Sequence, residues 1–130
     1  MSNSNEKEVM ATVDVSVTPT GRIRGNEVEC DLEGRDVEDD AIFLERDRTF
    51  VINFNLDPHG PDSWDEENPF SARTGKCPRP DAEPHGLMRV TDVSPKQLTV
   101  TAGPVRRRSV IHYRLNFADD TTCDPIIIIG

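Results

Sequence analysis

Apolar and polar residues alternate along several short stretches of this chain. Residues 49–56 are the clearest case, with Asn53 and Asn55 on one side of the backbone and four apolar residues on the other: Phe50, Ile52, Phe54 and Leu56. Residues 9–17 alternate in the same way through Val9, Ala11, Val13, Val15 and Val17. A period of two residues is typical of a β-strand that buries one face, so both stretches are predicted to be such strands.

Strand-like character extends to further stretches, which are 27–32, 41–45, 87–93, 97–102, 109–117 and 123–129. Turn-forming residues separate the stretches at intervals of about 8 to 12 residues, and no stretch keeps a helical period. About eight short strands of this kind predict an all-β protein in which two antiparallel sheets pack face to face. A jelly roll or a small barrel is the open alternative.

One segment breaks the regular spacing. Residues 57–86 hold six of the ten prolines and three of the eight glycines, which predicts one long Pro-rich loop. Loops of this length are uncommon in compact domains and tend to be functional or loosely ordered. Trp64 and Phe70 lie inside the segment, and we expect them to pin it onto the sheets, with a short strand around Trp64.

Length and cysteine content narrow the class of protein. A chain of 130 residues has the usual size of a single domain, and we expect a disordered leader over residues 1–8 followed by one domain over residues 9–130. The three cysteines, Cys30, Cys77 and Cys123, are odd in number and widely spaced, which favours reduced thiols. No signal-peptide pattern is present in the leader, so a cytoplasmic location is expected.

Net charge and the length of the apolar runs each argue against one class of partner. A net charge of −9 repels phosphate backbones, so nucleic-acid binding is not expected, although residues 106–108 are a run of three arginines. The longest apolar runs have four residues, whereas about 20 are needed to span a bilayer, so no membrane insertion is expected. The acidic field favours a basic protein partner instead.

Two similar tetrapeptides raise the question of a metal site. Asp-Pro-His-Gly begins at Asp57 and Glu-Pro-His-Gly begins at Glu83, with Cys77 between them. If the ends of the long loop meet, three ligands of a tetrahedral zinc site are available, namely His59, Cys77 and His85. Their spacing matches no standard zinc pattern, and the alternative is that each tetrapeptide is a turn. Calcium is a second option, through Asp36, Glu38, Asp39 and Asp40 or through Asp62, Asp65, Glu66 and Glu67.

No motif of a common enzyme class occurs in the chain, so enzyme activity and a cofactor are not expected. The remaining histidine, His112, is predicted to be an exposed structural residue. The four isoleucines at 126–129 would need burial on both faces of a strand. A contact with another subunit and a cover provided by the same chain are both open explanations for that need.

The pattern as a whole resembles a known family. An aromatic-rich strand, a turn and then Asp124-Pro125 with a hydrophobic end follow a mid-chain Asp57-Pro58 and Glu83-Pro84. In this the chain resembles the DP-EP family of small bacterial β-sandwich proteins, from about Val9 onward. The resemblance implies an immunoglobulin-like fold and a bacterial origin, and it implies no known activity or ligand.

The sequence therefore predicts a small β-sandwich protein that acts as a non-catalytic binding or assembly module. It would contact a protein partner, or a second copy of itself, through an exposed sheet edge or through the loop at 57–86. The alternative is a zinc-binding protein with His59, Cys77 and His85 as its ligands.

Overall fold

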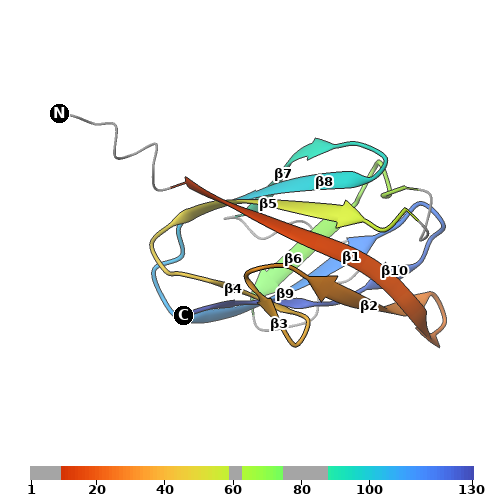
Figure 1. Ribbon diagram of the computed structural model, residues 1–130, viewed down its shortest axis with the longest axis horizontal. Coiled ribbons are helices and arrows are strands. Elements are labelled where there is room, and N and C mark those ends of the chain that lie inside the picture. Colours follow the sequence, from red (N-terminus) through yellow and green to blue (C-terminus); the bar gives the residue numbers. More distant parts are fainter. Residues whose placement is uncertain (1–9, 59–62, 75–87) are drawn as a thin grey trace.

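The computed structural model describes residues 10–58, 63–74 and 88–130, and these residues form eleven β-strands and no helix (Figure 1). The all-β prediction is confirmed. None of the segments in these ranges is a helix long and apolar enough to cross a bilayer. In chain order the strands are β1 (Met10–Arg24), β2 (Glu27–Glu33), β3 (Val37–Glu38), β4 (Ala41–Leu44), β5 (Thr49–Leu56), β6 (Phe70–Thr74), β7 (Met88–Val93), β8 (Gln97–Ala102), β9 (Ser109–Asn116), β10 (Thr122–Cys123) and β11 (Ile126–Ile129).

Hydrogen bonds join the strands into one mixed sheet. The strand order is β3-β4-β11-β9-β10-β2-β1-β5-β8-β7, and β6 pairs with β9 beside this path. Most neighbours are antiparallel, but β1 runs parallel to β5, β4 parallel to β11, and β10 parallel to β2. The arrangement therefore departs from the wholly antiparallel pattern that the sequence predicts. Parallel neighbours require a connection that crosses to the other end of the sheet, and alternation of apolar residues does not reveal such crossings.

The long sheet folds over so that its two halves face each other. Phe54 of β5 lies far along the hydrogen-bonded path from β9, yet its ring centroid is 5.7 Å from that of Tyr113 on β9. It is also 6.3 Å from the ring of Phe70 on β6. All three side chains are buried. The core thus lies between a layer of β7, β8, β5, β1 and β2 and a layer of β6, β9, β11, β4 and β3 (Figure 1).

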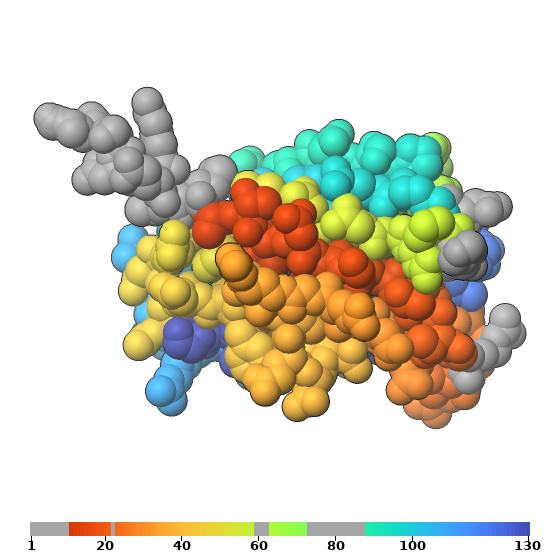
Figure 2. All heavy atoms as spheres, viewed as in Figure 1, coloured from red at the N-terminus to blue at the C-terminus, as the bar shows by residue number. Residues whose placement is uncertain are grey.

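The alternation read from the sequence appears directly in the first of these layers. In β5 the residues are buried and half-buried in turn, with Phe50, Ile52, Phe54 and Leu56 inward. Strand β1 is longer than predicted and reaches Arg24, where it forms a hairpin with β2. Figure 2 shows β1, in red, crossing the visible face between β5 and β2.

The segment at 57–86 is only partly the loop that the sequence predicts. It contains β6, which pairs with β9 through Phe70 and Leu115. Trp64 is fully buried, forms a single bridge with Phe117, and stacks on that ring at 5.2 Å between centroids. The two aromatic residues therefore pin the segment to the sheet as expected, but the strand forms around Phe70 rather than around Trp64.

Replacement of Phe54 by alanine tests how much the two-layer packing contributes. The change removes a fully buried ring that touches Phe70 and Tyr113, so we expect the free energy of unfolding in urea to fall by about 3 to 5 kcal/mol. Ile23→Ala is the control, since Ile23 is 57% exposed and its loss should cost about 1 kcal/mol or less. Equal losses in the two variants would show that Phe54 does not hold the layers together.

Candidate functional site

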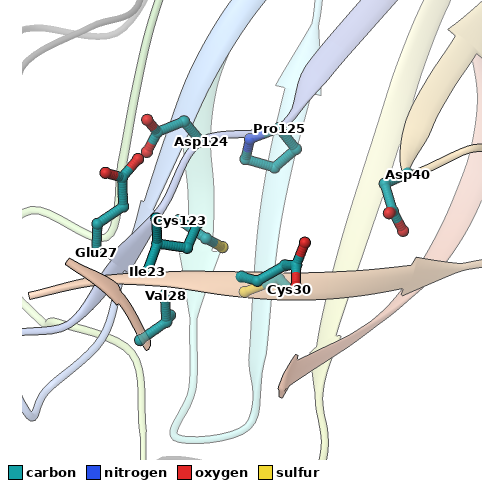
Figure 3. A pocket seen from close by; sticks show the side chains of 9 residues that line it. Ile23, Glu27, Val28, Cys30, Asp40, Cys123, Asp124 and Pro125 are labelled. Atoms are coloured by element: carbon teal, nitrogen blue, oxygen red, sulfur yellow. The ribbon is translucent and has the colours of Figure 1, made fainter. Parts of the chain in front are cut away.

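Two buried cysteines lie in an open pocket where the two layers meet. Cys30 belongs to β2 and Cys123 to β10, and neither is in a disulfide. Figure 3 shows both in the middle of the lining residues, with Glu27 and Asp124 to one side and Asp40 to the other. The pocket has a volume of about 170 Å³, which is small compared with the roughly 300 Å³ or more of typical ligand sites. The pocket is therefore too small for a large molecule, and the two thiols are the feature that could give it a function.

Local sequence explains why the cysteines meet. In β2, Cys30 and Leu32 point inward because the strand alternates, and the exposed fraction of Cys30 is 8%. On the other side, β10 is a two-residue strand in which Cys123 pairs with Leu115 of β9. Beyond it, Pro125 has no amide hydrogen to donate, which suits the entry to β11.

The contact between β2 and β10 is a narrow seam between the layers. A single residue pair, Thr122 with Glu27, defines the parallel bridge. The Thr122 amide donates to the Asn26 carbonyl at 2.9 Å, and the Asn26 side chain donates to the Asp120 carbonyl at 3.0 Å. Few hydrogen bonds therefore close the sheet at the place where the thiols lie.

The two thiols contact each other. A side-chain hydrogen bond to Cys30 raises the pKa of Cys123 well above its ordinary value, with smaller contributions from burial and from the charge of Asp124. A hydrogen bond that favours the protonated form of an acid raises its pKa. Cys123 is consequently a neutral thiol at pH 7.

A tyrosine hydroxyl lies close to the same pair. Tyr113 of β9 is fully buried, and its Oη atom has no hydrogen-bond partner. Burial raises its pKa well above 10, and the neighbouring Cys123, Cys30 and Asp40 raise it further. A buried hydroxyl without a partner costs about 1 to 3 kcal/mol, so the ring is held there by its packing.

An ion pair borders the pocket. Arg114 Nη1 lies 3.6 Å from Asp124 Oδ1, and the two side chains are only 16% and 14% exposed. Arg114 also donates to the Thr122 hydroxyl at 3.0 Å. The guanidinium therefore connects β9 to β10 and offsets part of the negative charge that Glu27, Asp40 and Asp124 bring to the pocket.

The zinc ligands proposed from the sequence, His59, Cys77 and His85, lie outside the described residues. Within residues 10–58, 63–74 and 88–130, no group of three or more His, Cys, Asp or Glu side chains could hold a metal ion.

Two of the acidic residues considered for calcium, Asp40 and Asp65, have contacts with the backbone, and Asp62 lies outside the described residues. Asp40 accepts a hydrogen bond from the Leu32 amide at 3.0 Å. Asp65 accepts from the amides of Glu67 at 2.9 Å and Asn68 at 3.2 Å, which is the geometry of a turn. These two carboxylates therefore bind the local backbone.

A second candidate site is an apolar row on the outer face of the layer that contains β4, β11 and β9. Ile128 of β11 lies opposite Phe43 on one side and Val110 on the other. Phe43 and Val110 are 44% and 42% exposed, and Ile128 is half-buried. The sequence pointed to this place through its four isoleucines, of which Ile127 and Ile129 enter the core. It did not reveal Phe43, because 41–45 shows no clear alternation.

Comparison with known proteins yields no match, whether with a family model, a curated protein or a solved structure.

The Arg114–Asp124 pair can be tested with Asp124→Asn. This change removes the charge of the carboxylate that pairs with a mostly buried guanidinium, so we expect the free energy of unfolding to fall by about 2 to 4 kcal/mol. Asp47→Asn is the matched control, since Asp47 pairs with Arg106 on the surface and its loss should cost less than about 0.5 kcal/mol. A similar small loss in both variants would show that the buried pair is not structural.

Tyr113→Phe should stabilise the protein by about 1 kcal/mol at pH 7, because it removes a buried hydroxyl that has no partner. The gain should grow above about pH 10, where the phenol ionises in the unfolded chain but stays protonated in the folded one, so that the wild type alone loses stability as the pH rises. Urea unfolding at several pH values measures both effects. Because the chain has a single tyrosine, its absorbance also reports the raised pKa directly. A destabilised Phe variant would mean that the hydroxyl has a bonding role.

Proposed function

We propose that this protein is a non-catalytic assembly module that associates with a second copy of itself through the outer face of the β4, β11 and β9 layer. The observation that carries the proposal is the apolar row of Phe43, Ile128 and Val110. Single exposed apolar residues are normal on a protein surface, whereas three in register across neighbouring strands form a continuous patch. No charged residue interrupts that row.

The row beside it supports a symmetric partner. Glu38, Ala41, Ile126 and His112 lie opposite one another in order across β3, β4, β11 and β9. Glu38 is the acidic end of this second row, and past His112 the register continues to Arg73 of β6. A two-fold axis along the strands, placed between β4 and β11, would bring Glu38 of one copy over His112 of the other. The same rotation would place Phe43 of one copy over Ile128 of the other.

A stable dimer would need a contact larger than the apolar row alone. Stable interfaces bury about 800 Å² on each partner, which three half-exposed side chains do not supply. The contact must therefore include both rows and their flanks. The −9 charge of each copy opposes association, so the dimer should strengthen as salt screens that repulsion.

The immunoglobulin-like description of the fold is likewise a proposal, and so is the resemblance to the DP-EP family. Two facing layers with alternately buried strands support it. The parallel pairs β1–β5 and β4–β11 depart from the antiparallel pattern of that architecture. The assembly proposal depends only on the outer face and holds for either description.

Sedimentation of the purified protein tests the assembly. The wild type should be a dimer at micromolar concentration, and the double variant Phe43→Ser, Val110→Ser should raise the dissociation constant at least about 100-fold, because each change occurs twice in a symmetric interface. Ile23→Ser is the control, since Ile23 is the most exposed large apolar side chain among the described residues and lies on β1, away from the rows. A monomeric wild type at high salt, or a dimer that the double variant retains, would disprove the proposal.

A further inference from the structure

We propose that Cys30 and Cys123 are a redox-modifiable pair which a hydroperoxide converts to an intramolecular disulfide. The site is distinct from the outer apolar face and does not depend on the assembly proposed above. It joins two strands from different parts of the chain, β2 and β10, and it opens to solvent through the pocket in Figure 3.

The geometry of the sulfurs carries the proposal. Cys30 and Cys123 line the same pocket, and Figure 3 shows their side chains next to each other before any reaction. A disulfide requires the two sulfur atoms to approach to about 2.05 Å, a movement that rotation about the Cα–Cβ bonds can supply. No third metal-ligating group joins the pair among the residues that the structure describes, which favours bond formation over metal binding.

The reaction assigns different roles to the two cysteines. Cys30 lines the pocket with 8% of its surface exposed, against 2% for Cys123, so the oxidant reaches Cys30 first. Its sulfur attacks the peroxide, the O–O bond breaks, and a sulfenic acid and one water form. The Cys123 sulfur then attacks the sulfenic sulfur, the S–O bond breaks, and a second water leaves. Two thiols and one hydrogen peroxide thus give one disulfide and two waters.

The surroundings make the reaction slow at neutral pH. The second step needs the Cys123 thiolate, whereas the hydrogen bond with Cys30, burial and the charge of Asp124 keep this thiol protonated by raising its pKa. The rate of disulfide formation should therefore rise with pH over the range in which the protein stays folded. A slow, mostly buried pair is suited to sustained oxidation rather than to rapid turnover.

The bond would strengthen a junction of the sheet that a single residue pair defines. It would lie beside the Thr122–Glu27 bridge, which a few hydrogen bonds hold closed. It would also close a loop of about ninety residues, and disulfides that close long loops stabilise most in the chain-entropy description. The expected effect is a rise in Tm of at least about 5 °C.

The test uses the full chain with Cys77→Ser, which leaves Cys30 and Cys123 as the only thiols. After treatment with hydrogen peroxide at pH 8.5, quenching and alkylation in denaturant, the intact mass should fall by two hydrogens and show no alkyl adduct. Tandem mass spectrometry of the digest should give the peptides of Cys30 and Cys123 linked together. The Tm should rise and return to its starting value with dithiothreitol.

Cys30→Ala and Cys123→Ala in the same background are the controls, and neither should show the Tm rise. The proposal is overturned if the Cys77→Ser protein keeps two alkylatable thiols after oxidation. It is also overturned if its product is a sulfinic acid, or a covalent dimer in place of the internal link. Circular dichroism of each protein before oxidation verifies that it is folded, and the linked-peptide result needs only the Cys77→Ser protein.

Discussion

Contact between the aromatic side chains of β5, β6 and β9 is the interaction on which the rest of the structure depends. Phe54, Phe70 and Tyr113 bring strands together that are far apart along the hydrogen-bonded path. Only 5% of the residues are aromatic, so these few rings supply much of the large apolar surface in the core. The packing also explains why the hydroxyl of Tyr113 is buried without a partner. The contacts of the ring with Phe54 and Phe70 offset the cost of burying that hydroxyl.

The sequence was a good guide to what lies inside and a poor guide to which strands are neighbours. Alternation in 49–56 predicted the inward residues of β5 correctly, because burial on one face of a strand dictates a period of two. The parallel neighbours β1–β5 and β4–β11 were missed, since pairing depends on where the chain crosses between layers. The short strand β10 was read as part of one strand with β11, although Asp124-Pro125 separates the two.

Of the two candidate sites, the sequence indicated the apolar outer face but not the cysteine pair. Four consecutive isoleucines place two side chains on each face of a strand, so the sequence indicated apolar residues on the outer face as well as in the core. Ile128 lies in the middle of the outer row. The cysteine pair could not be found from spacing, because Cys30 and Cys123 meet only through the fold. From their wide spacing in the sequence, the cysteines were predicted to be separate reduced thiols, whereas in the structure Cys30 and Cys123 are neighbours. His59, Cys77 and His85 stay a hypothesis based on residue type alone.

The position of β11 has a consequence for how the chain folds. This strand inserts between β9 and β4, so β4 acquires that neighbour only when a segment about eighty residues further along has docked. Closing so long a loop is entropically expensive and slows folding. Until β11 docks, Ile42 and Leu44 sit on an open strand edge, available to pair with another chain. The period of greatest risk of misassembly is therefore the folding process, before the native sheet has closed.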